Sequence, residues 1–128
     1  MHTIKVRGFH CDMFGHVNNA RYLEFLEEAR WEWLNRIGPF DFFENKNLSF
    51  VVVNININYK RPSILNDELI ITVELKSIGN KSAVVHQTIT RKSDNKLIAD
   101  ADVTFAMVDN VTGRAIALDE NMREILSK

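Results

Sequence analysis

Residues 12–19 concentrate the side chains of this chain that are best suited to chemistry. Asp12 supplies a carboxylate and His16 an imidazole, and Asn18 and Asn19 lead directly into an amphipathic segment. A carboxylate can activate water as a general base or attack a carbonyl carbon as a nucleophile. The free N–H groups of a helix N-terminus can stabilise the oxyanion that forms. The segment therefore contains the parts needed to activate water and to polarise a carbonyl.

Each of these residues also has a plain structural interpretation. An aspartate before a helix often caps a turn, a loop histidine often bonds to the backbone, and asparagine is a common N-cap. The neighbouring Cys11 is interpreted as a packing residue, because no base partner for its thiol can be assigned in the adjacent sequence. Residue types alone leave both interpretations open.

Composition narrows the class of protein. The chain has 128 residues, of which 45% are hydrophobic and 26% charged, and this predicts one globular domain over residues 1–128. Its 16 basic and 17 acidic residues form no long block of one sign, which argues against a nucleic-acid partner. The single cysteine excludes an internal disulfide and cannot build a structural zinc site alone. We expect neither a metal nor a cofactor.

The location of the protein is predicted from what the sequence lacks. Residues 1–7 have no apolar core of the kind found in signal peptides. No apolar run approaches the roughly 20 residues that a membrane-spanning helix needs. The sequence therefore predicts a cytoplasmic protein without a membrane span.

The elements that position residues 12–19 follow from hydrophobic periodicity. Alternation of apolar and polar residues over 4–7 predicts a short first strand. Apolar residues at three- and four-residue spacing then predict a helix from about Asn19 to Arg36, which Gly38 and Pro39 end. The predicted apolar stripe of this helix comprises Tyr22, Leu23, Leu26, Ala29, Trp33, Leu34 and Ile37.

Further along the chain the period changes to two. Strands are predicted over 50–59, 69–75, 83–91 and 97–107, and a short C-terminal helix is capped by Asp119. In the first of these strands one face carries only apolar residues and tyrosine, and the other is rich in asparagine. The two predicted faces are Val51, Val53, Ile55, Ile57 and Tyr59 against Val52, Asn54, Asn56 and Asn58.

This order of elements predicts an α+β fold in which an antiparallel sheet of about five strands wraps around one long central helix. A single sheet leaves long edges and one uncovered face, so we expect a homodimer or homotetramer assembled through the sheet. Asparagine is depleted in strands. The row Asn54, Asn56 and Asn58 therefore fits either a solvent-facing strip or a hydrogen-bonded subunit contact.

The motif and the element order together resemble the hot-dog-fold thioesterases, specifically their 4-hydroxybenzoyl-CoA thioesterase-like branch. The likeness covers nearly the whole chain, and the residues that carry it are Asp12, 15–19, 22–25, 27–30 and 50–59. The resemblance implies a hot-dog fold and hydrolysis of fatty acyl-CoA to free fatty acid and CoA. Within the family the likeness favours long-chain substrates and a link to fatty-acid β-oxidation.

The resemblance also implies roles for single residues. Asp12 is the expected general base or nucleophile, the backbone amide near Asn19 the oxyanion donor, and His16 an orienting group. Many relatives carry an acidic residue where His10 stands, so His10 and His16 could both titrate near neutral pH. Glu28 is a rival base, because another hot-dog branch uses a glutamate of the helix.

Substrate contacts are less specific in the sequence. The pairs Lys60-Arg61 and Arg91-Lys92 could bind the phosphates of coenzyme A, although charged residues at turns are usually only solvated. Four phenylalanines either line a channel for the acyl chain or belong to the core: Phe40, Phe42, Phe43 and Phe50.

Two alternative functions remain open at this point. An acyl-ACP thioesterase would use the same chemistry and add a surface that contacts the carrier protein. A non-catalytic acyl-CoA-binding hot-dog protein would bind the thioester without hydrolysing it. The complete motif around Asp12 argues against the second alternative.

Overall fold

The predicted helix is α1, Asn19–Ile37, in the computed structural model, which describes residues 1–38 and 47–128. Asn18 is the N-cap, and its side-chain oxygen accepts a hydrogen bond from the Ala20 N–H. Gly38 ends the helix with φ of 86°, a left-handed conformation that glycine adopts without steric cost. Within the described ranges, no helix is long and apolar enough to cross a membrane.

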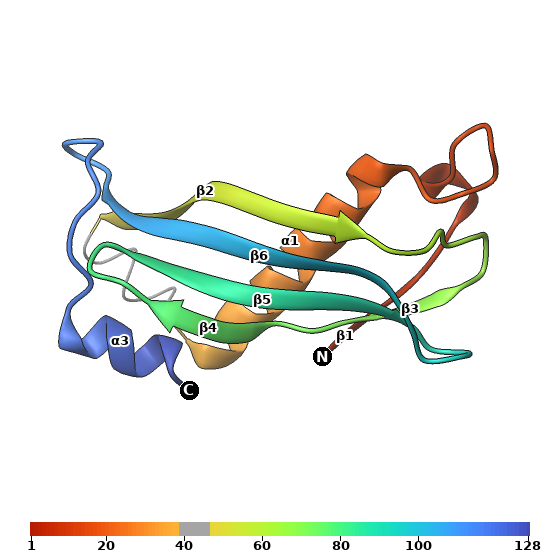
Figure 1. The fold of residues 1–128 in the computed structure, drawn as a ribbon. Coiled ribbons are helices and arrows are strands. Elements are labelled where there is room, and N and C mark those ends of the chain that lie inside the picture. The colour runs from red at the N-terminus through yellow and green to blue at the C-terminus, as the bar shows by residue number, and fades with distance from the viewer. Residues whose placement is uncertain (39–46) are drawn as a thin grey trace.

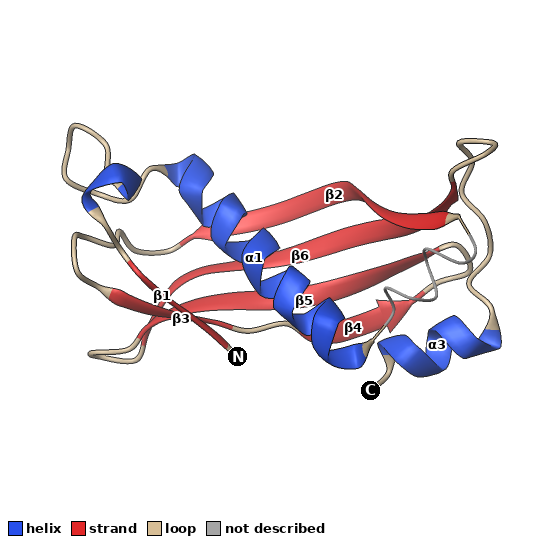
Figure 2. Ribbon diagram, turned by 180° about the vertical axis from the view of Figure 1, so that it is seen from behind, coloured by secondary structure: helices blue, strands red, loops and turns tan. Residues whose placement is uncertain are grey.

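The strands form one antiparallel sheet in the order β1-β3-β5-β6-β2, with β4 also paired to β5. The helix crosses one face of this sheet diagonally (Figure 2), which confirms the predicted α+β architecture. The sheet has six strands rather than about five. In chain order the elements other than α1 are β1 His2–Lys5, the short 3-10 helix η1 Gly8–His10, β2 Leu48–Tyr59, β3 Glu68–Ile71, β4 Glu74–Ile78, β5 Ser82–Arg91, β6 Lys96–Asp109 and α3 Glu120–Leu126 (Figure 1).

The additional strand arises because the strand predicted over residues 69–75 is divided at Thr72. β3 and β4 pair with β5 on either side of the division. At the division the Thr72 N–H donates to the Thr88 carbonyl, while the Thr72 hydroxyl accepts from the Thr88 N–H. A side-chain oxygen thus replaces a backbone carbonyl at one position of the ladder.

The first strand lies two residues earlier than the alternation over 4–7 predicts. β1 pairs with β3 from His2 to Lys5. The Val6 N–H still donates to the Asp67 carbonyl, but the Arg7 N–H donates to the His10 ring nitrogen Nδ1 at 2.8 Å. That side-chain bond turns the chain into η1 and ends the strand.

A bulge in β2 reverses part of its predicted pattern. Pairing with β6 passes from Val52 directly to Asn54, so Val53 has no residue opposite it. Val52 stands opposite a buried phenylalanine of β6 and therefore shares the helix side of the sheet with Ile55. The prediction that Val51 belongs to that face is wrong, because one inserted residue moves every earlier side chain to the other face.

The two faces of the sheet differ in character. The helix side forms the core with α1, and inward-facing residues alternate along β5 as predicted. The alternation predicted for β6 fails at its start, because a bulge at Ile98 buries both Ile98 and Ala99 and places Leu97 opposite Thr90. The other side is polar: Asn58 donates to the Asp100 carboxylate at 3.0 Å, and Asp102 accepts from both Lys76 and His86. The asparagine row of β2 thus continues a polar surface that crosses β6.

Candidate active site

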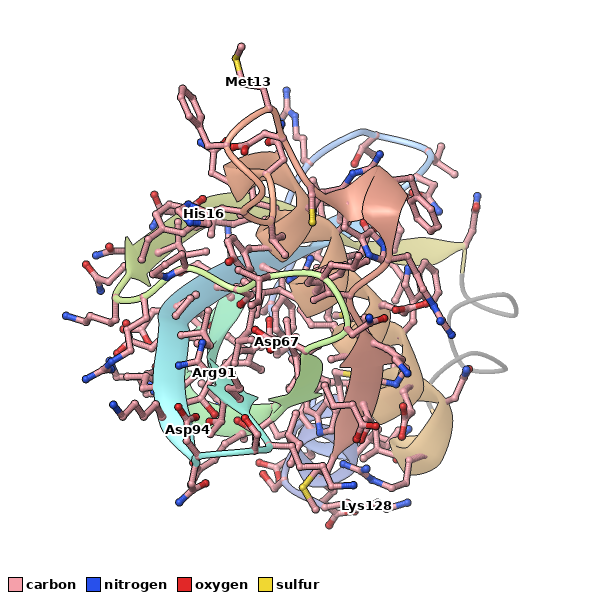
Figure 3. The ribbon with its side chains drawn as sticks, turned by 90° about the vertical axis from the view of Figure 1, so that its right-hand side faces the viewer. Met13, His16, Asp67, Arg91, Asp94 and Lys128 are labelled. Carbon is pink, nitrogen blue, oxygen red and sulfur yellow. The ribbon has the colours of Figure 1, made fainter. Side chains whose placement is uncertain are left out.

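Residues 11–17 form a small hairpin that leads into α1. An isolated antiparallel bridge closes its base, the Asp12 N–H donates to the His16 carbonyl at 2.8 Å, and the Gly15 N–H donates to the Asp12 carbonyl at 3.0 Å. Gly15 has φ of 79°, so a residue with a side chain would be strained there. Asp12 lies at the base of the hairpin, next to this bridge. Met13 points outward (Figure 3).

Two neighbouring segments fix the position of this hairpin. The Val17 N–H donates to the Ser63 carbonyl at 2.9 Å, and the Asn18 N–H donates to the His10 carbonyl at 2.8 Å. Ser63 lies in the loop between β2 and β3, and its own N–H donates to the buried Tyr22 hydroxyl of α1. The candidate site is therefore held by backbone hydrogen bonds from η1 and from the β2–β3 loop.

The Asp12 carboxylate is exposed and only half bonded. Its Oδ1 accepts from the Phe14 N–H at 2.9 Å, which is the turn-capping interaction expected of an aspartate at such a position. Its Oδ2 has no donor among residues 1–38 and 47–128. The Asp12 side chain therefore caps the turn with one oxygen and leaves the other oxygen available to bind water.

The backbone N–H groups at the start of α1 differ in their hydrogen bonding. The Ala20 N–H donates to the Asn18 side chain at 3.0 Å, and the Arg21 N–H donates to the Asn18 carbonyl at 2.9 Å. The Asn19 N–H has no acceptor in the described part of the chain. It lies at the positive end of the helix dipole, where an oxyanion would be stabilised.

The two loop histidines differ in their surroundings. His10 is 9% exposed, its Nδ1 accepts from the Arg7 N–H, and its ring meets the Phe25 ring edge-on with 5.0 Å between centroids. Burial lowers the pKa of His10, and its hydrogen bond from the Arg7 N–H makes it a structural group of the loop. The His16 side chain is exposed, and its backbone carbonyl anchors the Asp12 N–H.

The predicted phosphate ligands Arg91 and Lys92 are engaged in the fold. Arg91 donates through Nε and Nη2 to both oxygens of Asp94, at 3.1 and 2.9 Å, and through Nη1 to the Pro62 carbonyl. Hydrogen bonding to Arg91 holds the pKa of the Asp94 carboxyl below its usual value. Lys92 pairs with Glu68 at 3.3 Å. These groups close a turn and anchor the β2–β3 loop, as Figure 3 shows for Arg91.

Lys60 and Arg61 are the more available basic pair. Both are exposed at the point where β2 ends and the β2–β3 loop begins. Arg61 donates from Nη1 to the Leu97 carbonyl at 2.8 Å, whereas the Lys60 side chain has no partner among the described residues. Since this loop also holds Val17, the pair lies on a segment that contacts the Asp12 hairpin.

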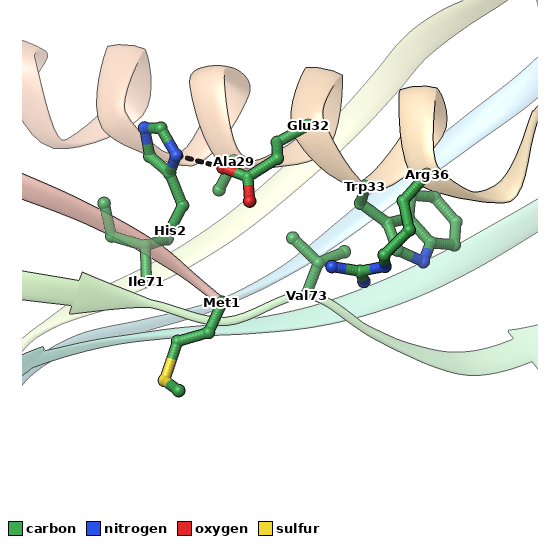
Figure 4. Close-up of a pocket in the computed structure, with 8 residues that line it drawn as sticks. All are labelled: Met1, His2, Ala29, Glu32, Trp33, Arg36, Ile71 and Val73. Atoms are coloured by element: carbon green, nitrogen blue, oxygen red, sulfur yellow. Dashed lines mark hydrogen bonds and ion pairs between the residues drawn. The ribbon is translucent and has the colours of Figure 1, made fainter.

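The rival base Glu28 lies more than two turns into α1 and is bonded to β1. Its carboxylate accepts from Nε2 of His2 at 3.1 Å, and the next acidic residue on that flank, Glu32, bonds to Nδ1 of the same ring. Figure 4 shows the His2–Glu32 contact at the edge of a pocket whose lining also includes Trp33 and Arg36. No contact brings Glu28 to the Asp12 hairpin in the described structure.

The proposed acyl channel is only partly described. Phe40, Phe42 and Phe43 lie outside the described residues. Phe50 packs against Phe105 with 4.6 Å between ring centroids. Among the residues that the structure describes, no group of three or more histidine, cysteine, aspartate or glutamate residues could hold a metal ion.

Comparison with known proteins identifies the family. Residues 6–126 match the family model of the thioesterase-like superfamily. The chain belongs to this superfamily. It is 50% identical over 125 residues to "Long-chain acyl-CoA thioesterase FadM" of Escherichia coli (strain K12), and the match covers 98% of this chain and 95% of that protein. The predicted thioesterase-like family is thus confirmed.

Solved structures of thioesterases share the fold. The probable thioesterase YbaW from Escherichia coli has a TM-score of 0.92 and 49% identity, covering 98% of this chain and 95% of that chain. A thioesterase from Thermus thermophilus, solved with coenzyme A and Zn, has a TM-score of 0.82 and 30% identity over 97% of this chain and 88% of its own. Both structures therefore present this helix and sheet in the same arrangement.

Sequence reasoning missed a polar pair inside the thioesterase fold. Gln87 stands in phase with the core residues of β5 and is fully buried, although its side chain is polar. Its side-chain oxygen accepts a hydrogen bond from Arg30 of α1 at 3.1 Å. A glutamine among inward-facing apolar positions was the available signal, because a buried amide requires partners.

Proposed function

We propose that this chain hydrolyses long-chain fatty acyl-CoA to the free fatty acid and coenzyme A. The observation that carries the proposal is the half-free Asp12 carboxylate, followed in the same segment by the unbonded Asn19 N–H. The 50% identity to a long-chain acyl-CoA thioesterase supports the substrate class. We also propose that residues 1–128 act as one catalytic domain in the cytoplasm, with a role in β-oxidation.

In the proposed mechanism the free Oδ2 of Asp12 meets the reacting water or the thioester carbon. As a general base, Asp12 takes the proton of a water that attacks the carbonyl carbon; as a nucleophile, it forms an acyl-enzyme anhydride that water then cleaves. In both routes the carbonyl oxygen becomes an oxyanion that the Asn19 N–H stabilises. One such donor contributes roughly 10²–10³-fold in rate. The C–S bond then breaks and releases the CoA thiolate.

Lys60 and Arg61 are the proposed ligands for the phosphates of coenzyme A. Both are exposed on the loop that anchors the hairpin, whereas Arg91 and Lys92 are paired with carboxylates. The coenzyme A bound to a 30% identical thioesterase supports CoA as the carrier. His16 is proposed to orient the Asp12 residue through its backbone carbonyl, which accepts from the Asp12 N–H.

We propose that the protein works as a homodimer or homotetramer joined through the free edge of β2. That edge exposes a row of large side chains, and an uncovered apolar edge strand is a template for pairing with another chain. The residues concerned, with their exposed fractions, are Val51 44%, Val52 42%, Val53 60%, Ile55 37% and Tyr59 45%.

The test is a thioester hydrolysis panel with a free-thiol readout. Acyl-CoA substrates from short to long chain are compared with the matching acyl-ACP thioesters at equal concentration. The proposal expects kcat/KM to rise with chain length and to favour CoA over ACP. Equal values along the series would exclude a long-chain channel, and a preference for ACP would favour the carrier-protein alternative. Binding of acyl-CoA without turnover would make the protein a non-catalytic sensor.

A further inference from the structure

Large apolar side chains are exposed at the end of the molecule that carries the Asp12 hairpin. They come from three segments: η1, the hairpin and the β2–β3 loop (residues 60–67). Each is at least half exposed, and Met13 is 91% exposed. We call this set the apolar tip, and its members are Phe9, Met13, Phe14, Ile64 and Leu65. Several apolar side chains on neighbouring loops form a patch, and such a patch usually marks an interaction surface.

Backbone contacts join the three segments of the apolar tip. The Asn18 N–H, at the end of the hairpin, donates to the His10 carbonyl of η1 at 2.8 Å. On the other side of the hairpin, His16 forms an isolated antiparallel bridge with Ile64 of the β2–β3 loop. Figures 1 and 2 show η1, the hairpin and this loop together at the end of the molecule opposite α3. The five side chains therefore project from one connected piece of backbone.

The same segments carry an excess of positive charge. Residues 7–21 and 60–67 contain four basic residues against two aspartates, whereas the whole chain has a formal net charge of −1. Within the described ranges two charged residues of these segments are in ion pairs, Arg21 with Glu24 and Asp67 with Arg91. Three exposed basic residues have no carboxylate within ion-pair distance in the described structure: Arg7, Lys60 and Arg61. Unpaired cations thus stand beside the apolar tip.

This combination is complementary to an anionic lipid surface. Apolar side chains gain free energy by entering the boundary between headgroups and acyl chains, while lysine and arginine remain at the level of the phosphates. Each basic residue near an anionic bilayer strengthens the binding several-fold. A protein partner would have to offer a shaped pocket for each protruding side chain. A fluid lipid interface accommodates such side chains without preformed pockets.

We propose that the apolar tip docks this protein on the surface of an anionic phospholipid bilayer. Met13 and Phe14 enter the interface, and Arg7 faces the lipid phosphates together with the Lys60-Arg61 pair. The docking does not rest on the proposed hydrolysis, but that activity gives it a use. A long acyl chain partitions into a bilayer, and Asp12 directly precedes Met13 in the docked hairpin.

Vesicle co-sedimentation of the full chain, without substrate, tests the docking. Vesicles of phosphatidylcholine alone are compared with vesicles that also contain phosphatidylglycerol. We expect binding to the mixed vesicles at low ionic strength, weaker binding at high salt because salt screens exposed charges, and little binding to phosphatidylcholine alone. Absence of binding to the mixed vesicles overturns the proposal. Equal binding to both kinds of vesicle overturns the part assigned to charge.

Side-chain variants locate the docking surface. Met13→Ser is expected to weaken binding to the mixed vesicles about tenfold, because the apolar surface that enters the interface is lost. Val111→Ser is the matched control, since Val111 is a highly exposed apolar residue between β6 and α3; it should bind as wild type does. Arg7→Gln should weaken binding several-fold. Equal binding of wild type and Met13→Ser overturns the proposal.

A fluorescent label distinguishes insertion from adsorption by charge alone. In a Cys11→Ser background, an environment-sensitive dye is attached at Met13→Cys or, as the control, at Val111→Cys. With mixed vesicles we expect a blue shift of the emission at position 13 and none at position 111, because only the first enters an apolar environment. A shift at both positions, or at neither, overturns the insertion of the apolar tip.

The outcomes also separate other occupants and the proposed function. A shift at position 13 without vesicles, on raising the protein concentration or on adding acyl carrier protein, would assign the apolar tip to a second copy or to that protein and overturn lipid docking. A chain that hydrolyses acyl-CoA but does not bind vesicles overturns the docking alone. A chain that binds vesicles through Met13 without turnover overturns the proposed activity and supports the docking.

Discussion

Two turns at the same end of the molecule use one local device with opposite outcomes. In the hairpin, the Asp12 carboxylate accepts from the N–H two residues later, at Phe14. In the β5–β6 turn, Asp94 accepts from the Lys96 N–H in the same way. Arg91 then occupies both oxygens of Asp94, whereas the second oxygen of Asp12 has no protein donor within the described ranges. The two aspartates therefore differ in their partners: Asp94 is bonded to the cationic Arg91, and Asp12 has no cationic partner among the described residues.

This contrast indicates how to distinguish a structural aspartate from a candidate catalytic one. Both residues stand in turns with glycine or asparagine at positive φ, Gly15 at 79° and Asn95 at 57°. Saturated hydrogen bonding makes Asp94 a brace for the turn and the β2–β3 loop. Incomplete hydrogen bonding leaves Asp12 able to bind water or meet a carbonyl carbon, which chemistry requires.

The largest expected effect is on turnover at Asp12. Asp12→Asn keeps the hydrogen bond to the Phe14 N–H through its amide oxygen but loses the basic oxygen. We expect kcat for long-chain acyl-CoA to fall roughly 10²–10⁴-fold, with an unchanged melting temperature. Asp94→Asn is the matched control and should retain kcat. Near-wild-type turnover in the Asp12 variant would remove the distinction between the two turns.

The second effect concerns the two basic pairs. Reversing both charges at Lys60 and Arg61 should raise KM for acyl-CoA by about tenfold with little change in kcat, because phosphate contacts act mainly in binding. Reversal of Lys81 and Arg114, near the opposite end of the sheet, controls for net charge and should leave KM unchanged. Equal KM values in both double variants would exclude Lys60 and Arg61 as the phosphate site.

A smaller effect is expected on stability at Asp94. Arg91 depresses the pKa of the Asp94 carboxyl, so its stabilising contribution is present above the unfolded-state pKa of about 3.9 and is lost as the pH falls through the folded-state pKa. Thermal unfolding of Asp94→Asn should therefore start below that of wild type at pH 7. The two curves should converge below about pH 4. A constant difference down to pH 2 would contradict the assigned cause.

The smallest effect is expected for the His16 side chain. Its described contribution to the hairpin is the backbone carbonyl, which His16→Ala retains. We expect kcat/KM to stay within about threefold of wild type and the shape of the pH–rate profile to persist. A shifted or missing limb in that profile would instead give His16 a direct role in proton transfer.

Several features were predictable because they depend on neighbouring residues. Asn18 caps α1 and Gly38 ends it, since capping and left-handed conformations are decided by local chemistry. Asp119 caps α3 for the same reason. The role proposed for Asp12 was also inferred from a local motif. The structure adds that one oxygen of its carboxylate is hydrogen-bonded and the other has no donor among the described residues.

Other features depend on contacts distant in sequence and were predicted incorrectly or missed. The bulge at Val53 moves the side chains before it in β2 to the other face of the sheet, because β6 has no residue opposite Val53. Thr72 divides a predicted strand because Thr88 is its neighbour across the sheet. His10 is buried because η1 folds its ring against Phe25, and this burial lowers its pKa. Each outcome requires the partner's position, which local periodicity does not contain.

The family, the order of elements and the segment proposed to carry the chemistry can all be read from the chain alone, because motifs, caps and hydrophobic periods lie in adjacent residues. Only the folded structure shows which charged side chains have hydrogen-bond or ion-pair partners. Folding pairs Arg91 with Asp94, joins Arg30 to the Gln87 amide, and leaves one oxygen of Asp12 without a donor in the described part of the chain. Hydrogen bonds and ion pairs are satisfied in space, so the groups left open become visible only after the chain has folded.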